Sequence, residues 1–344
     1  VREHIVRDLK IANSDFELLR AIGGECAGAL SLLPVDEVPS VKRTYVPLSP
    51  AAIADLVKNR GHIYAAYSRA ERPRLSLAGA QDKFALLVRD GQFLLPQGEA
   101  PSSHILKFEL TGYRHVPAYE TFTTMLAREI DLPVVEIDLV EIGGQSCSLT
   151  RRYDRYTDEG GEVQRLHQED FCQALGYPPD KKYQDSGGPS FADCFSALRE
   201  SSTDPALDTR NLLRWQAFNV FAGNSDGHAK NLSILRLEKG VTRLAPFYDL
   251  VCTRAIERID HRLACDVGGE RDPGRISASH WDRLASQCDI REQFLRGLVE
   301  ETATSLLEKL PTAKESFEKR FRPYPAIQRV ESVIRKQCRR ALSA

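Results

Sequence analysis

The sequence has 344 residues, of which 42% are hydrophobic and 28% charged, and its formal net charge is -1. The length allows one large or two medium domains, and the composition is typical of a soluble globular protein. The near-zero charge argues against a whole-protein nucleic-acid binder, and no apolar run approaches the roughly 20 residues that a membrane helix needs.

The eight cysteines are scattered and include no C-x-x-C pair, so neither a disulfide framework nor a zinc site is indicated. Reduced thiols in a cytoplasmic protein fit this pattern, and no signal peptide is visible. The chain begins with Val1 and contains one methionine, Met125. We therefore expect its natural N-terminus to be missing.

Residues 1–70 are predicted to be mainly helical, with one helix ending at Gly23 and another opening at Ser49-Pro50. A small-residue loop over 75–83 (LSLAGAQDK) then leads into a strand over 84–88. The Asp90-Gly91 pair predicts a tight hairpin turn, after which the chain returns over 92–95. A loop without bulky side chains lets backbone N–H groups approach phosphate oxygens. Taken alone, however, one glycine indicates only an ordinary loop.

A strand is predicted over 104–110, with Lys107 among apolar neighbours. This lysine is either a solvated edge residue or a phosphate contact that needs a carboxylate partner. Glu120 is a candidate partner, near the start of an amphipathic helix over 119–130.

Strands over 134–142 and 146–153 follow, separated by Gly143-Gly144. We expect the chain to become mainly helical from about residue 165, which predicts a hinge at 150–155. The expected division is therefore a β-rich N-lobe over 1–150 and a helical C-lobe over 151–344. Within the C-lobe, 184–190 (QDSGGPS) is predicted to be a flexible loop, and a helix is predicted over 291–310.

An apolar helical run over 212–221 stops at Gly223 and is followed by NSDGHAKN over 224–231. Asp226 and Asn231 have the D-x-x-x-x-N spacing of a phosphotransfer catalytic loop, in which the aspartate is the base. Asp226-Gly227 is alternatively a simple turn. A hairpin over 232–237 and 241–245 is expected to return Asp249 towards Asn231, so that these two residues hold a magnesium ion.

These segments occur in a characteristic order: LSLAGAQDKFALL, SSHILKF, the Glu120 helix, RRYDR, RLHQEDFCQALG, NSDGHAKNLSIL and LAPFYDL. From about residue 15 to its end, the sequence resembles the HipA-type serine/threonine kinases, the toxin halves of bacterial toxin–antitoxin pairs. The resemblance implies an α+β, two-lobed, protein-kinase-like fold that binds ATP and Mg²⁺.

The resemblance also implies roles for particular residues. Asp226 would be the general base, Asn231 and Asp249 the magnesium ligands, and Lys107 the phosphate contact oriented by Glu120. Ser76 matches the position at which family members phosphorylate and inactivate themselves. The remaining residues implied to surround ATP are the phosphate loop Ala78, Gly79, Ala80, Gln81, Asp82 and Lys83, the hinge residues Arg151, Arg152 and Tyr153, and the phosphate-side residues His228, Lys230 and Tyr248.

Family partners are a small helix-turn-helix antitoxin, through which DNA is bound, and substrates that are aminoacyl-tRNA synthetases. Two departures stand out: an N-terminal β-rich subdomain of full-length members is largely absent, and Arg151 replaces an acidic residue of some relatives. A co-repressor with a degenerate kinase fold and a small-molecule phosphotransferase are the alternative functions.

Overall fold

The computed structural model describes residues 2–36, 43–61 and 81–343. The chain forms two compact units that interleave along the sequence. Unit 1 comprises Val1–Gly112 and Glu136–Gln168, and unit 2 comprises Tyr113–Val135 and Glu169–Ala344. The single lobe boundary expected after residue 150 does not coincide with this division and stays a prediction.

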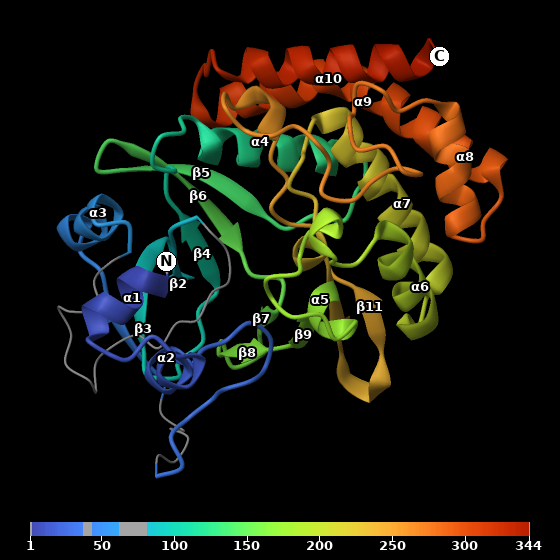
Figure 1. The fold of residues 1–344 in the computed structure, drawn as a ribbon. Helices are drawn as coiled ribbons and strands as arrows, with labels where there is room; N and C mark the ends of the chain where they lie inside the picture. The colour runs from blue at the N-terminus through green and yellow to red at the C-terminus, as the bar shows by residue number, and fades with distance from the viewer. Residues whose placement is uncertain (1, 37–42, 62–80, 344) are drawn as a thin grey trace. The chain divides into compact units, whose positions relative to one another are not determined.

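Unit 1 is built on a six-stranded antiparallel sheet with strand order β1-β3-β2-β4-β6-β5 (Figure 1). Its strands are β1 (Thr44–Pro47), β2 (Lys83–Arg89), β3 (Gln92–Gln97), β4 (His104–Lys107), β5 (Ile137–Ile142) and β6 (Gln145–Arg151). Among its described residues, the helices of this unit are α1 (Arg2–Leu9), α2 (Asp15–Ile22) and α3 (Pro50–Lys58), and a short ribbon is formed by β7 (Arg155–Thr157) and β8 (Val163–Arg165).

Local signals account for several of these elements. The β2–β3 hairpin turns at Asp90 and Gly91, whose φ values of 51° and 73° suit the two left-handed positions of a type I′ turn. Ser49 caps α3 by accepting a hydrogen bond from the Ala52 N–H, and Pro50 begins the helix. Apolar side chains from α3 and from the sheet form one core, which includes Leu56, Val57, Phe84, Leu106 and Phe108.

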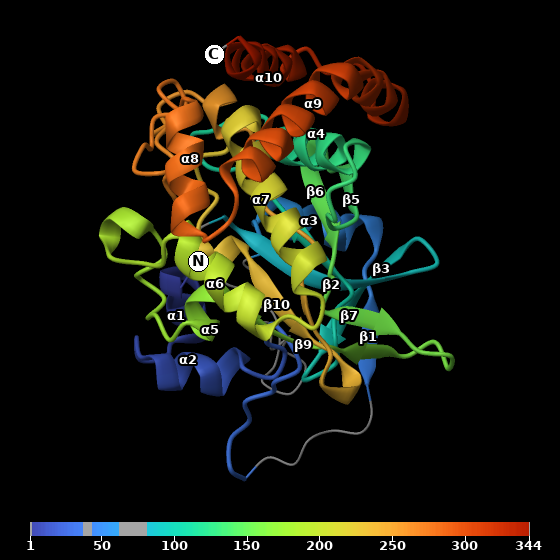
Figure 2. The ribbon, with the colours of Figure 1, turned by 90° about the vertical axis from the view of Figure 1, so that its right-hand side faces the viewer.

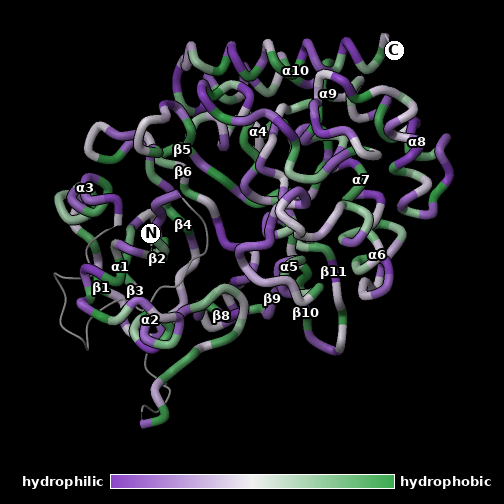
Figure 3. Tube along the Cα trace, viewed as in Figure 1, coloured by the Kyte–Doolittle hydropathy of each residue, from purple (hydrophilic) through white to green (hydrophobic). Residues whose placement is uncertain are grey.

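Unit 2 is mainly helical. Its helices are α4 (Val116–Glu129), α5 (Phe171–Ala174), α6 (Phe191–Ser201), α7 (Pro205–Ala222), α8 (Ala278–Gln287), α9 (Glu292–Phe321) and α10 (Ile327–Leu342). Helix α9 packs against α4, α7, α8 and α10 (Figure 2). Along α10, apolar positions recur at helical spacing (Figure 3), and Ile327, Val330, Ile334 and Cys338 are buried.

Two sequence predictions for this half are wrong. Residues 165–170 were expected to begin the helical half, but they end β8 and form β9 (His167–Asp170), which joins β10 (Ser233–Arg236) and β11 (Thr242–Leu244) in a three-stranded sheet. Asp170 caps α5, so the helix begins only after it. The helix expected to stop at residue 310 continues through Pro311 to Phe321, because Leu310, Ala313 and Phe317 on the same helix are all buried.

All eight cysteines are free thiols, and seven of them are buried. Cys26 alone among the eight is partly exposed. Within the described ranges, no helix combines the length and the apolar character that crossing a membrane requires.

Candidate active site

The candidate catalytic loop begins where α7 ends. Gly223 stops the helix with a φ of 67°, and its N–H donates to the Asn219 carbonyl. A Cβ atom at Gly223 would lie 2.8 Å from Val333 Cγ1 and 2.9 Å from Arg254 Cβ. Glycine is thus required here both by the left-handed backbone and by the close approach of neighbours.

The loop is held by buried amides. Asn224 donates from Nδ2 to Asn219 Oδ1 over 3.0 Å, and its Oδ1 accepts from the Asp226 N–H over 3.1 Å. A Cβ atom at Gly227 would lie 2.8 Å from Asn219 Nδ2, so the loop also sits close above α7. The Asp226 backbone is therefore fixed by side chains of the preceding helix and loop.

Asp226 presents a carboxylate that is 50% exposed. The Tyr183 hydroxyl donates to its Oδ1 over 2.7 Å, and His228 Nε2 lies 3.7 Å from the same oxygen. Burial lowers the pKa of His228, and the Lys182 ammonium, 2.9 Å from Nε2, lowers it further against the opposing charges of Asp226 and Asp249. The imidazole is thus neutral at pH 7, and both carboxylates act on it electrostatically.

Asn231 is oriented towards the same loop. It closes a short 3₁₀ turn (Ala229–Asn231), and its Nδ2 donates to the Asp226 carbonyl over 2.9 Å. Because the amide nitrogen donates this hydrogen bond, Oδ1 is the atom that can coordinate a metal ion or accept a hydrogen bond. The two residues that define the D-x-x-x-x-N spacing are therefore joined directly.

Tyr248 and Asp249 follow β11. The Tyr248 hydroxyl donates to the Lys230 carbonyl over 2.9 Å and lies 2.8 Å from Ser233 Oγ, which ties this segment to the catalytic loop. Asp249 has a left-handed backbone, with φ 54°. The hairpin thus returns the chain to the loop, as the sequence predicts.

The donor chemistry fits magnesium. Asn231 and Asp249 offer an amide and a carboxylate oxygen, and Mg²⁺ sites commonly use one or two protein oxygens together with phosphates and waters. Over the part of the chain that the structure describes, no three His, Cys, Asp or Glu side chains form a metal site of their own. A closed all-protein cage is therefore not among the described residues.

Lys230 has a carboxylate partner within unit 2. Its Nζ donates to Asp170 Oδ2 over 2.7 Å, and the two side chains are 19% and 13% exposed. Asp170 simultaneously caps α5 by accepting from the Gln173 N–H. The pair links the catalytic loop to the start of α5.

The nucleotide residues predicted in unit 1 lie along its sheet. Lys83 on β2 and Lys107 on β4 are directly opposite each other in the antiparallel register. Lys107 is buried, with an exposed fraction of 5%. Gln81 Nε2 donates to the Phe108 carbonyl over 2.7 Å, and the Asp82 carbonyl accepts from the Phe108 N–H. Hydrogen bonds thus join the end of the predicted phosphate loop to the residue that follows Lys107.

The three hinge candidates differ in their surroundings. Arg151 is half-exposed and pairs with Glu136, and the Tyr153 hydroxyl donates to Gln168 Oε1 over 2.8 Å. Arg152 is buried, and its guanidinium donates to Glu25, Asp154 and Ser102. A nucleotide contact by Arg152 would therefore use main-chain atoms, because its side chain is already engaged.

Several predicted residues are not brought together by the described structure. Ser76, Ala78, Gly79 and Ala80 lie outside the described residues. Lys107 belongs to unit 1 and Glu120, which is buried on α4, belongs to unit 2, so their pairing stays a prediction.

Sequence reasoning missed Lys182, Tyr183 and Asp170. Lys182 and Tyr183 directly precede the loop over 184–190, but no motif marks them. Asp170 lies in the RLHQEDFCQALG segment, where the Asp170–Gln173 capping spacing predicts a helix start rather than a partner for Lys230.

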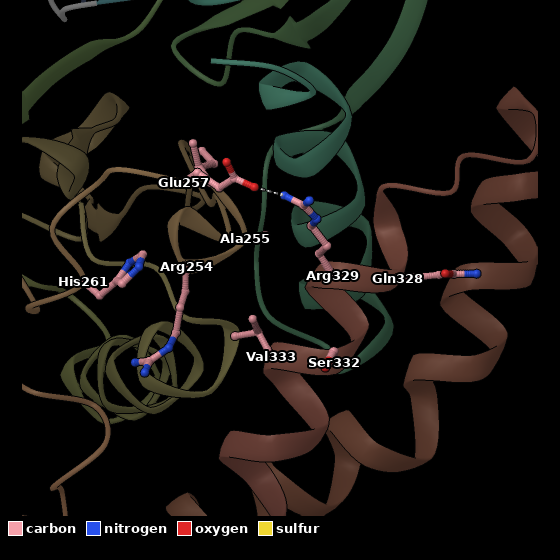
Figure 4. A pocket seen from close by; sticks show the side chains of 9 residues that line it. Arg254, Ala255, Glu257, His261, Gln328, Arg329, Ser332 and Val333 are labelled. Carbon is pink, nitrogen blue, oxygen red and sulfur yellow. Dashed lines mark hydrogen bonds and ion pairs between the residues drawn. The ribbon is translucent and has the colours of Figure 1, made fainter. Parts of the chain in front are cut away.

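A separate hollow of about 440 Å³ lies in unit 2 between the 254–261 segment and α10 (Figure 4). The Glu257–Arg329 ion pair, at 3.0 Å, joins its two walls. The Arg254 N–H donates to the Gly223 carbonyl, so one wall adjoins the end of α7. The residues of the candidate active site do not line it.

The model of the HipA-like C-terminal domain matches residues 75–310. A Sinorhizobium fredii relative, Y4mE, is 37% identical over 88% of this chain and 74% of its own length. The serine/threonine-protein kinase toxin HipA of Shewanella oneidensis is 31% identical to this chain. The match covers 80% of this chain and 65% of that protein.

A solved complex of Shewanella oneidensis HipA, HipB and operator DNA contains a chain that matches with a TM-score of 0.84 and 26% identity. The match covers 99% of this chain and 82% of that one. The fold is thus α+β and protein-kinase-like, as the sequence predicts. The chain belongs to the family of HipA-type kinases.

Proposed function

We propose that this chain is an ATP- and magnesium-dependent kinase that transfers the γ-phosphate to a serine or threonine hydroxyl of a protein. The observation that carries the proposal is the joined loop of Asp226, His228 and Asn231. Its carboxylate is half-exposed, its histidine is buried and neutral, and its asparagine is hydrogen-bonded to the Asp226 carbonyl.

Asp226 is assigned the role of accepting the proton of the attacking hydroxyl. As the new O–P bond forms, the bond between the γ-phosphorus and the ADP oxygen breaks, and ADP leaves. Asn231 and Asp249 would hold magnesium, which when bound neutralises charge on the phosphates. Lys107, Lys83 and the backbone of the loop over 78–83 are assigned to the phosphates, with Glu120 orienting Lys107 and the 151–153 segment holding the base.

The proposed regulation and partners follow from family membership. Autophosphorylation of Ser76 would add about -1.5 to -2 charges beside a loop assigned to phosphate binding, which opposes ATP binding. A HipB-like helix-turn-helix antitoxin is the proposed partner, supported by the matched complex that contains HipB and operator DNA. An aminoacyl-tRNA synthetase is the proposed substrate class.

The test is transfer of labelled γ-phosphate from ATP, with magnesium, to proteins of a bacterial lysate and to the chain itself. We expect labelled protein with the wild-type chain and a loss of at least about 100-fold in the Asp226→Asn variant, because the proton acceptor is removed. Asp289→Asn is the matched control, since that carboxylate is 93% exposed and lies outside the site.

Mass spectrometry should locate autophosphorylation on Ser76 in the wild type and find none in Asp226→Asn. Label found only on a metabolite would contradict a protein substrate. Nucleotide binding without any transfer would contradict the enzymatic function and favour a co-repressor.

A further inference from the structure

The Tyr183 hydroxyl reaches Asp226 from outside the catalytic loop. It donates to Oδ1 over 2.7 Å, and its ring meets the His228 imidazole edge to face, with centroids 5.1 Å apart at 80°. Lys182 completes the cluster: its Nζ lies 2.9 Å from His228 Nε2 and 4.7 Å from the centroid of the Tyr183 ring. Two consecutive side chains thus contact Asp226 and His228 of the loop.

Hydrogen bonds hold the backbone at Tyr183 and at the residue after it. Gln184 Oε1 accepts from the Asp266 N–H over 3.0 Å, and the Tyr183 carbonyl accepts from the Gly188 N–H over 2.9 Å. A Cβ atom at Gly188 would lie 2.4 Å from the Lys181 carbonyl oxygen, so the turn is closely packed on itself. The position of the phenol is therefore set by the surrounding fold as well as by its own rotamer.

We propose that Tyr183 is a positioning residue, which holds one oxygen of Asp226 so that the other faces the attacking hydroxyl. This inference rests on the proposed kinase function. A carboxylate has two oxygens that rotate together, and a donor bound to Oδ1 fixes the direction in which Oδ2 can accept a proton. Half of the Asp226 side chain is exposed, which leaves room for a hydroxyl from a substrate.

The chemistry of the cluster supports a donor role for the phenol. Burial, followed by the Asp226 charge and the hydrogen bond to it, raises the pKa of Tyr183 above its ordinary value. The hydroxyl therefore keeps its proton at physiological pH and cannot compete with Asp226 as a base. Lys182 can only donate to His228 Nε2, so the proton of the neutral imidazole is assigned to Nδ1.

Two other roles for Tyr183 make opposite predictions. If the phenol occupied the position of the attacking hydroxyl as a plug, its removal would raise the rate of transfer. If it only packed against His228, its hydroxyl would matter for neither rate nor binding. Tyr183→Phe separates the three roles because it removes one oxygen atom and leaves the ring contact with His228.

The experiment measures phosphate transfer by purified wild-type, Tyr183→Phe and Tyr177→Phe chains, with kcat, KM for ATP and Tm for each. Tyr177 lies six residues earlier in the same connecting segment and serves as the hydroxyl control. We expect Tyr183→Phe to lower kcat by about tenfold, as for loss of a hydrogen bond to a charged group. KM for ATP should stay at the wild-type value, and Tm should fall by no more than the few degrees that the loss of one hydrogen bond causes. Tyr177→Phe should match the wild type throughout.

An unchanged or raised kcat in Tyr183→Phe, with an active wild type, overturns the positioning role and leaves the kinase function standing. A fall in kcat accompanied by an equal fall in Tyr177→Phe, or by a fall in Tm of about 10 °C or more, also overturns it, because the effect is then structural. Absence of transfer by the wild type overturns the kinase function and this inference together.

Discussion

Lys230, inside the candidate catalytic loop, donates a 2.7 Å hydrogen bond to Asp170, which lies 60 residues earlier in the sequence. One carboxylate therefore serves two purposes: it caps α5 and it neutralises a lysine beside the proposed base. These contributions can be separated, because asparagine is as good an N-cap as aspartate but carries no charge.

We expect Asp170→Asn to lower the free energy of unfolding by about 1 kcal/mol through loss of the charged hydrogen bond. Asp170→Ala should cost about 1 kcal/mol more, because the N-cap is lost as well. Urea denaturation of the two variants beside the wild type measures the difference. Equal effects of the two substitutions would show that the cap contributes nothing.

Asp249→Asn tests the proposed metal ligand. Asparagine tolerates the left-handed backbone at this position, so the substitution removes a charge with little strain. We expect ATP binding in the presence of magnesium to weaken by at least about tenfold, as for damage to a metal site. Binding measured without magnesium should change little. A titration of ATP with and without magnesium checks this, and an unchanged magnesium dependence would refute the assignment.

Glu25 is the centre of a buried ion cluster in unit 1. Its carboxylate is fully buried and accepts from Arg152 Nη1 over 3.0 Å and from Arg155 Nη2 over 2.6 Å. Glu25→Gln should destabilise the chain by about 3–5 kcal/mol, because it leaves buried guanidinium charge uncompensated. Glu136→Gln, which breaks the half-exposed pair with Arg151, should cost less than about 1 kcal/mol. Thermal unfolding of both variants provides the comparison.

Asp154 makes the same cluster sensitive to acid. Burial acts to raise its pKa, but the Arg152 and Arg155 guanidinium groups and the Gly28 N–H outweigh burial and lower the pKa to about 2. Because the folded pKa lies below the unfolded value of about 3.9, the charged group stabilises the fold above pH 4, and this contribution is lost between about pH 4 and pH 2.

We expect the ionised Asp154 carboxylate to contribute roughly 2 kcal/mol to the free energy of unfolding, and we expect this contribution to be lost in acid. The Asp154→Asn variant should be less stable at pH 7 and should lose less stability than the wild type between pH 5 and pH 2. Denaturation curves at several pH values test this. Parallel losses in the two proteins would contradict the lowered pKa.

Gly223 and Gly240 offer a matched pair of left-handed glycines, with φ values of 67° and 75°. A Cβ atom at Gly240 meets nothing within 4 Å, whereas one at Gly223 meets Val333 and Arg254 at less than 3 Å. Gly240→Ala should cost about 1 kcal/mol from backbone strain alone. Gly223→Ala should cost clearly more and should also reduce transfer, because it displaces the start of the catalytic loop. Similar losses of stability would argue that the contacts at Gly223 relax freely.

Much of the fold could be predicted from the sequence where the signal is local. The Asp90-Gly91 turn, the Ser49-Pro50 helix start and the end of α7 at Gly223 each depend on a few adjacent residues. β9 was missed because a strand of four residues depends on pairing with distant strands. The continuation of α9 past Pro311 was missed because burial of Phe317, which favours the helix, is not visible in the local pattern.

The same contrast applies to the candidate site. The spacing of Asp226 and Asn231 predicts the loop, and the structure joins these residues by a hydrogen bond. Tyr183 could not be predicted, because its contact with Asp226 spans 43 residues and depends on how 263–271 holds the intervening segment.

The reactivity of the seven buried thiols can report which parts of the fold open locally. A thiol reagent too large to enter the interior should label the native chain only at Cys26, which is partly exposed. Each local opening of the fold would expose further cysteines, and these lie at known positions in β6, α5, α6 and α10, directly after α8, and in the segments around 252 and 265. The order in which these positions react would show which elements of the kinase open first, without any substitution in the chain.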